Sequence, residues 1–213
     1  MSARDDVLAA VRQALGPGRD VSDAHPVPAS AGPPASTREV PTGADHATML
    51  ALFAERVADY RATVTRCAPA DLAAAVAAAL DGASSTVVPQ GLAVEVAGAV
   101  VDDGLSTADL DAVAAVVTTA ALGIAETGTI VLDHGPGQGR RVVTLLPDLH
   151  VCVVREDQVV PDVLDALTRL DPNRPQTWVS GPSATSDIEL SRVEGVHGPR
   201  RLHVILVAGE GGS

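Results

Sequence analysis

The sequence contains no lysine, three aromatic residues and two cysteines, and each shortage excludes a class of function. Without lysine, the chain has neither the amine for Schiff-base chemistry nor the basic residue of a Walker phosphate-binding loop. Phe53, Tyr60 and Trp178 are too few for the stacking platforms that bind single-stranded nucleic acid. Cys67 and Cys152 lie far apart and outside any C-x-x-C motif, so a disulfide framework, a zinc knuckle and an iron–sulfur cluster lack their ligands.

The charge balance is strongly acidic, with 27 acidic and 15 basic residues and a formal net charge of -12. A surface of this sign repels phosphate backbones, and we expect no nucleic-acid partner. Charged residues interrupt the amino-terminal segment where a signal peptide has its apolar centre. No apolar run reaches the length of a membrane span, which is about 20 residues. These features predict a cytoplasmic protein.

Composition divides the 213 residues into one folded body with an appended arm. Residues 1–16 predict a helical arm with one apolar stripe, which either folds back on the body or docks on a partner. Residues 17–44 are rich in Pro, Ala and Gly and predict a linker. The body spans 45–208 and is followed by a short tail, 209–213. Hydrophobic residues make up 46% of the chain, so the body can bury a sizeable core of Val, Leu, Ile and Ala.

Within the body, short apolar segments alternate with helical periodicity, which is typical of an α/β fold. Helices are predicted over 49–60, over 69–80 and from Pro161 onward, the last with Val163, Leu164, Leu167 and Leu170 facing inward. Strands are predicted over 62–66, 85–89, 98–102, 113–118, 129–132, 142–146, 150–154, 178–180 and 202–207, with another at Ile124. We therefore predict an open mixed sheet, largely parallel, with antiparallel strands in its later part and helices on both faces.

Candidate functional residues are concentrated in three turns, of which the first runs from Gly123 to Thr129 between two apolar segments. Glu126 lies in this turn among small and hydroxyl-bearing residues. A carboxylate held there suits a general acid or base, or an acyl-accepting nucleophile, which Thr127 and Thr129 could orient. The alternative is a solvated acid in an ordinary turn.

The second turn, from His134 to Arg141, has three glycines within five residues, and two arginines follow them. Backbone N–H groups of such a loop can converge on an anion, and Arg140 and Arg141 would add charged donors. The turn lacks the G-x-G-x-x-G spacing of a dinucleotide-binding loop. It is therefore either a phosphate or carboxylate site or a plain hairpin loop.

The third turn runs from Ser180 to Pro199 after a predicted strand. Ser186 and Glu189 have the spacing of a capping box, which opens a helical turn. Hydroxyl groups gather near the positive end of that turn, on Ser183, Thr185 and Ser186. Anions bind at such places in α/β folds, although capping alone also explains the box. His197 is either an acid/base group or a structural turn residue.

Taken in order, the three turns resemble the LUD domain of lactate-utilization proteins. The resemblance rests on GIAETGTIVLDHGPGQGRR, LLPDLHVCVV, SGPSATSDIEL and GVHGPRRLHVILV. It covers about residues 45–208 and is strongest from residue 120 onward. Order and spacing are most similar to the small members of the family, which lack iron–sulfur motifs.

This resemblance implies a fold related to that of sugar-phosphate isomerases and CoA transferases. It also implies a role beside two iron–sulfur partner proteins in the oxidation of L-lactate to pyruvate. The motif residues of the family fall on Glu126, Thr127, Gly128, Thr129, Ser180, Gly181, Ser183, Asp187, Glu189, His197 and Gly198. Iron–sulfur clusters are expected on the partners, and no cofactor is expected on this chain.

Together, these considerations assign Glu126 and His197 as candidate catalytic residues. The candidate ligand-binding residues are Thr127, Gly128, Thr129, Gly137, Gly139, Arg140, Arg141, Ser180, Gly181, Ser183, Thr185, Asp187, Glu189 and Gly198. No spacing of His and carboxylates predicts a metal site, so His134, His150 and His203 stay unassigned. Three functions remain open. They are a non-redox component that binds an anion, an acyl-transfer or phosphate-ligand enzyme that uses Glu126, and a purely structural assembly subunit.

Overall fold

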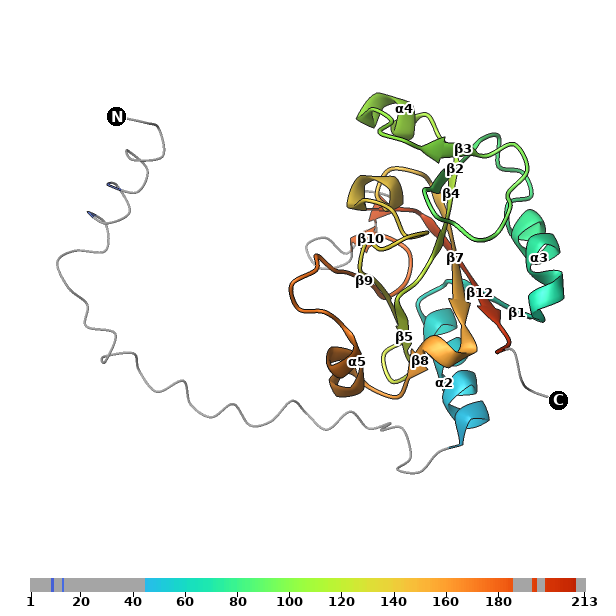
Figure 1. Cartoon of the computed structure of the whole chain (residues 1–213), viewed down its shortest axis with the longest axis vertical. Helices are drawn as coiled ribbons and strands as arrows, with labels where there is room; N and C mark the ends of the chain where they lie inside the picture. The colour runs from blue at the N-terminus through green and yellow to red at the C-terminus, as the bar shows by residue number, and fades with distance from the viewer. Residues whose placement is uncertain (1–8, 10–12, 14–44, 186–192, 195–197, 210–213) are drawn as a thin grey trace. The chain divides into compact units, whose positions relative to one another are not determined.

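The computed structural model describes residues 45–185, 193–194 and 198–209, together with the single positions 9 and 13 (Figure 1). Apart from those two positions, the predicted arm and linker lie outside the described residues. Most of the predicted tail and part of the third turn do so as well. The body is described almost throughout.

A parallel sheet of six strands forms the centre of the body, with the strand order β1-β12-β7-β4-β2-β3. Its strands are β1 (Thr63–Cys67), β2 (Thr86–Pro89), β3 (Val100–Asp102), β4 (Ala115–Thr119), β7 (Leu149–Arg155) and β12 (Arg201–Val207). Every pair of neighbours in this sheet is parallel. The inner strands β4, β7 and β12 consist largely of buried apolar residues because helices cover both faces of the parallel sheet.

Helices cover both faces of the parallel sheet, as predicted. On one face lies α2 (His46–Asp59), whose Leu50, Phe53 and Val57 are buried at helical spacing. On the other face lies α3 (Leu72–Ala79), which follows the 3-10 turn η2 (Pro69–Asp71) and buries Val76 (Figure 1). Side chains of β7 alternate between the two faces, with Cys152 and Val154 toward α2 and Val151 and Val153 toward α3.

The antiparallel pairs lie in a second sheet with the order β8-β5-β6-β9, in which β6 is antiparallel to both of its neighbours and β8 is parallel to β5. Its strands are β5 (Leu122–Ile124), β6 (Thr129–Leu132), β8 (Val159–Val160) and β9 (Thr177–Val179). One face packs with α2 onto the parallel sheet through Ile130 and Leu132. The other face is covered by α5 (Val163–Arg169). A short ribbon pairs β10 (Ala184–Thr185) with β11 (Val193–Glu194).

Two local predictions are wrong. The segment predicted as a strand over 142–146 is the 3-10 helix η3 (Arg141–Thr144), in which Val143 packs against Leu110 of α4 (Thr107–Asp111). In α5, Leu164 and Leu167 are 74% and 55% exposed, whereas Ala166 and Leu170 are buried. The helix presents its small Ala166 to the second sheet, which turns the two leucines toward solvent.

In the part of the chain that the structure describes, no helix is long and apolar enough to span a bilayer.

Candidate functional site

A cavity of about 150 Å³ lies where η3, the amino ends of β7 and β12, and the residues after β9 meet. We call it the Arg141 cavity. Five predicted site residues line it: Arg141, Ser180, Gly181, Ser183 and Gly198. The structure thus brings the end of the second turn and both ends of the third turn to one place. The cavity lies beside the carboxyl end of β9 in the second sheet and at the amino ends of β7 and β12 in the parallel sheet.

The third turn is held over the end of α2 by a close packing contact. Gly181 has a φ of +91°, and a Cβ on it would lie 2.5 Å from Cβ of Tyr60. Only glycine fits this position, which explains the motif glycine without a ligand. Further on, the N–H of Ser183 donates to the carbonyl of Pro199 at 2.8 Å, which joins the two ends of the turn.

The first turn reaches the Arg141 cavity through a line of hydroxyl groups. Oγ1 of Thr127 and Oγ1 of Thr129 are hydrogen-bonded at 2.7 Å, and Oγ1 of Thr129 is hydrogen-bonded to Oγ of Ser180 at 2.7 Å. Ser180 lines the cavity, but Thr127 and Thr129 do not. A hydroxyl group can both donate and accept a hydrogen bond, so Thr127, Thr129 and Ser180 form a continuous hydrogen-bonded chain between the two turns.

Gly128 has a packing role in this turn. Its φ is +60°, and a Cβ on it would lie 2.6 Å from the carbonyl carbon of Arg56 and 2.7 Å from N of Val57. The turn therefore rests on the backbone of α2. Gly123 is similar, because a Cβ there would lie 2.9 Å from the ring of Phe53.

Glu126 is partly buried, and its N–H donates to the carbonyl of Pro161 at 3.0 Å. Among the described residues, its carboxylate has no hydrogen bond or ion pair, and Glu126 does not line the Arg141 cavity. The structure therefore leaves this carboxylate open to an outside partner but does not bring it to the cavity wall.

Three backbone N–H groups of the second turn, those of Gly135, Gly137 and Gln138, already donate to protein acceptors. The N–H of Gly135 donates to Oδ1 of Asp133 at 3.1 Å, and that of Gly137 donates to the carbonyl of Gln90 at 2.9 Å. The N–H of Gln138 donates to the carbonyl of Gly135 at 3.1 Å. Because these donors already have protein acceptors, the loop is a connection that joins the ends of β2 and β4.

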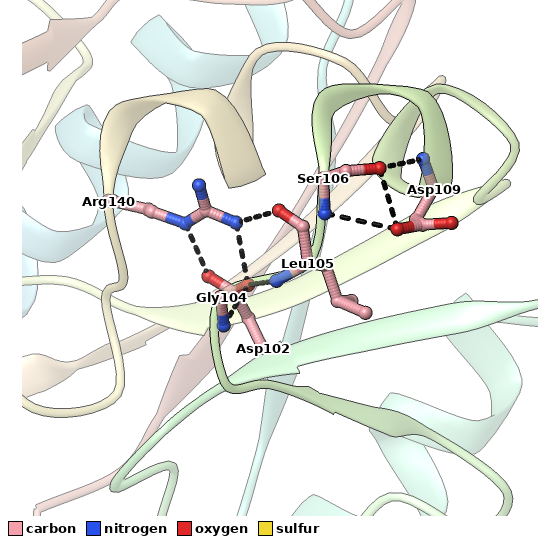
Figure 2. A network of polar contacts seen from close by, with 6 residues as sticks. All are labelled: Asp102, Gly104, Leu105, Ser106, Asp109 and Arg140. Atoms are coloured by element: carbon pink, nitrogen blue, oxygen red, sulfur yellow. Dashed lines mark hydrogen bonds and ion pairs between the residues drawn. The ribbon is translucent and has the colours of Figure 1, made fainter.

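Arg140 ties this turn to β3 (Figure 2). Its Nε and Nη2 donate to the carboxylate of Asp102, each at 2.8 Å, and Nη2 also donates to the carbonyl of Leu105. Asp102 is only 8% exposed and also accepts the N–H groups of Gly104 and Leu105. The Arg140 guanidinium, helped by these amides, holds the pKa of the Asp102 carboxyl below its usual range. This structural role was not predicted from the sequence.

The surroundings of Arg141 differ from those of Arg140. It lines the cavity, and its Nη1 donates to Oγ1 of Thr144 at 3.2 Å. Within the described ranges, it forms no ion pair with a carboxylate. Partial burial lowers the pKa of its guanidinium from a very high starting value, so the group stays charged. Its positive charge therefore lies at the wall of the cavity with no acidic partner among the described residues.

His150 also lines the cavity, and sequence reasoning missed it. It lies near the start of β7, is 2% exposed, and its Nε2 is hydrogen-bonded to Oγ1 of Thr118 at 2.8 Å. Burial, together with the charge of Arg141, lowers its pKa to about 4, so the imidazole is neutral at pH 7. The signal was a histidine inside an otherwise apolar predicted strand, and the sequence analysis left it unassigned.

The remaining predicted site residues are Gly137, Gly139, Thr185, Asp187, Glu189 and His197. Gly137 and Gly139 have φ angles of +76° and +73° and belong to the second turn. Thr185 belongs to β10, but its side chain lies outside the described residues, as do Asp187, Glu189 and His197. Across the described ranges, no group of three or more His, Cys, Asp or Glu side chains could hold a metal ion.

Comparisons with known proteins agree on one family. The model of the LUD domain matches residues 107–207. Lactate utilization protein C of Deinococcus radiodurans is 49% identical over 177 residues, which cover 79% of this chain and 84% of that protein. Lactate utilization protein C of Bacillus subtilis is 33% identical over 100 residues, which cover 43% of this chain and 41% of that protein.

The α/β fold has a match among solved structures. The crystal structure of a DUF162-family protein from Deinococcus radiodurans has a TM-score of 0.67 and 42% identity to this chain. The match covers 77% of this chain and 99% of that one.

Proposed function

Because the chain belongs to the lactate utilization protein C family, we propose that it serves lactate utilization by binding a small carboxylate, lactate or pyruvate. On this proposal, iron–sulfur partner proteins carry the electrons. The Arg141 cavity is the binding site, and the three turns contribute to it in different ways.

The charge of Arg141 is the observation that carries this proposal. It is a guanidinium at a cavity wall, and among the described residues no carboxylate neutralises it. A carboxylate ligand would supply the missing charge through charge-assisted hydrogen bonds. Arg140, the neighbouring residue, already has Asp102 as its partner and is a weaker candidate.

Size and polarity support a ligand of this class. The Arg141 cavity has a volume of about 150 Å³. An engineered apolar cavity of about that volume in another protein holds benzene, which has six non-hydrogen atoms, and lactate and pyruvate also have six. Ser180 offers a hydroxyl group that is also hydrogen-bonded to Oγ1 of Thr129. Since a hydroxyl can donate or accept, Ser180 can meet either the 2-hydroxyl of lactate or the 2-oxo group of pyruvate.

Electron transfer is assigned to partners because of the donor set in the sequence. Oxidation of lactate to pyruvate removes two electrons, and a cofactor must receive them. An iron–sulfur cluster needs several cysteine ligands, and this sequence has only Cys67 and Cys152. A non-redox subunit that holds substrate or product beside its partners fits these properties.

Glu126 supports a second candidate function, acyl transfer or another reaction on a phosphate-bearing ligand. Its partly buried carboxylate has no partner in the part of the chain that the structure describes. In that reaction Glu126 would be the nucleophile or general base. His197, outside the described residues, would assist it. The third possibility is a subunit whose motifs only shape turns for assembly.

Growth on lactate separates these functions in a strain that lacks the native copy of the chain. We expect Arg141→Gln to impair growth and Arg200→Gln to support it, because Arg200 pairs with Asp148 on the surface. If Glu126→Gln abolishes growth while Arg141→Gln does not, the acyl-transfer function replaces carboxylate binding. If all three variants grow normally, the assembly role is favoured.

Co-purification tests the partners. The tagged full chain, isolated from its own cells, should bring iron–sulfur proteins with it, and the mixture should oxidise L-lactate with an artificial acceptor. Removal of the chain should lower that activity. Full activity without the chain would contradict a role in the reaction.

A further inference from the structure

A second hollow lies beyond the carboxyl ends of strands of the parallel sheet, whereas the Arg141 cavity lies at the amino ends of β7 and β12. It has a volume of about 450 Å³ and is lined by Thr119 at the end of β4 and by Arg155 at the end of β7. Gln158, Arg169 and Arg174 also line it. We call it, together with the apolar hollow that adjoins it, the carboxyl-edge groove.

The adjoining hollow is mostly apolar, although Glu95 and Asp157 also line it, and it lies under α3. Its volume is about 680 Å³, and its wall includes Leu72, Val94 and Val207. The two hollows share the lining residues Ala93, Thr119, Arg155 and Gln158. The groove is therefore continuous, with an arginine-rich end and an apolar end.

The arginine-rich end has spare hydrogen-bond donors. Arg174 pairs with Asp133 at 2.8 Å, and Arg155 pairs with Asp157 at 3.0 Å. Arg169, in the last turn of α5, has no ion pair among the described residues. Each guanidinium has five N–H donors, and one carboxylate engages only some of them. Three guanidinium groups around one hollow suit a phosphate, whose terminal oxygens accept from several donors at once.

The groove lies beyond the carboxyl ends of β4, β7 and β12, next to the position where α/β sheets commonly bind ligands. From β2 the chain continues outward to β3, whereas from β4 it continues in the other direction, to β7 and then β12. Neighbouring strands with diverging connections define a switch point, and ligands bind there beyond the carboxyl ends of the strands. Gly137 bridges β2 and β4 at this point by bonds to Gln90 and Thr119, so the groove opens on the side of β4 and β7.

We propose that the carboxyl-edge groove binds an organic phosphate, with its phosphate group among Arg155, Arg169 and Arg174 and its apolar body under α3. This site is separate from the Arg141 cavity, which lies at the amino ends of β7 and β12. The chain would then recognise two ligands, a small carboxylate and a larger phosphate ester, at opposite edges of one sheet.

Calorimetric titration of the full chain with three probes tests the proposal. The probes are inorganic phosphate, 1-naphthyl phosphate and 1-naphthoate. Because both ends of the groove contribute, 1-naphthyl phosphate should bind more tightly than either of the others. Arg169→Gln should weaken its binding about tenfold, the loss typical of one charged hydrogen bond. Arg200→Gln, which removes the same charge at the other edge, should leave the affinity unchanged.

The apolar end has its own test. Ala73 is an exposed residue of α3 that lines this end, so Ala73→Phe should fill it without disturbing the core. This variant should lose the preference for 1-naphthyl phosphate over inorganic phosphate. Three results would overturn the proposal: no binding of 1-naphthyl phosphate at millimolar concentration, equal binding of 1-naphthoate, or equal weakening by Arg169→Gln and Arg200→Gln.

Discussion

Oγ1 of Thr129 lies 2.7 Å from Oγ of Ser180, and this hydrogen bond joins two turns that are 51 residues apart in the sequence. Thr129 is in β6, whereas Ser180 follows β9, the antiparallel neighbour of β6. The pairing of these two strands therefore sets the position of a cavity-lining hydroxyl. It explains how a motif in the first turn can affect a ligand that the first turn does not contact.

Thr129→Val should weaken the binding of L-lactate. Valine keeps the shape of threonine but removes the hydroxyl group that half-buried Thr127 and exposed Ser180 share as a hydrogen-bond partner. The free energy of unfolding should fall by about 1 kcal/mol, the usual net contribution of a hydrogen bond. Thr168→Val is the matched control, because Thr168 is exposed and bonds only within α5. Calorimetry and urea unfolding measure the two effects, and equal results for both variants would contradict the role of Thr129.

Gly128→Ala should destabilise the fold by about 2–4 kcal/mol, because an added methyl group meets the backbone of α2 and φ is positive. Gly82→Ala is the control. Gly82 has a φ of +80°, but nothing lies within 4 Å of a Cβ there, so its cost should be only about 1 kcal/mol. Urea unfolding gives both values. A loss at Gly128 no greater than that at Gly82 would show that the packing on α2 is loose.

Asp102→Asn should lower the free energy of unfolding near neutral pH. In acid, the difference between the variant and the wild type should disappear. Arg140 holds the pKa of Asp102 below its usual 3.8, so the folded state favours the charged form. The stability from this pair is present above about pH 4 and is lost as the pH falls through the lowered pKa. Unfolding curves of the wild type and the variant should therefore converge below pH 4. A difference that persists into strong acid would assign the effect to shape instead of charge.

Arg140→Gln should cost more stability than Arg200→Gln. Both arginines pair with an aspartate, but the side chain of Asp102 is 6% exposed and that of Asp148 is 44% exposed. Removal of Arg140 strands a nearly buried carboxylate, whereas exposed pairs contribute little. Thermal unfolding of both variants is the measurement, and equal melting temperatures would contradict the structural role of Arg140.

His150 should make the wild type less stable as the pH falls from 6.5 toward 4. The unfolded chain takes up a proton near the usual histidine value of 6.5, but burial keeps the folded pKa at about 4. As the pH falls through this window, the free energy of unfolding therefore decreases by an amount on the order of 3 kcal/mol. His150→Gln should show a smaller decline, while His46→Gln, at an exposed position, should behave like the wild type. Identical slopes for all three proteins would show that His150 is accessible to protons.

Much of the fold follows from the sequence, because apolar period and turn residues are local signals. The strands near 63–67, 86–89 and 149–155 and the helix over 46–59 were predicted within a few residues. The partition into two sheets was not, since strand pairing depends on contacts distant in sequence. The exposure of Leu164 and Leu167 was missed because a helical stripe does not reveal which of its edges faces the sheet.

The candidate site shows the same limit at closer range. Arg140 and Arg141 are adjacent and were treated alike, yet one pairs with buried Asp102 and the other lines a cavity. The glycine-rich loop has residue types that suit an anion site, but three of its N–H groups donate to protein acceptors, one of which, the carbonyl of Gln90, is distant in sequence. Side-chain partners of this kind cannot be inferred from spacing.

Calorimetric titration of the full chain with L-lactate and pyruvate tests the central claim most directly. We expect one site for at least one of the two ligands. Arg141→Gln should weaken it about tenfold, the low end for a charged hydrogen bond because Arg141 is solvent-accessible, and Arg200→Gln should not. No binding of either ligand, or equal affinities for the wild type and Arg141→Gln, would contradict the assignment of the Arg141 cavity.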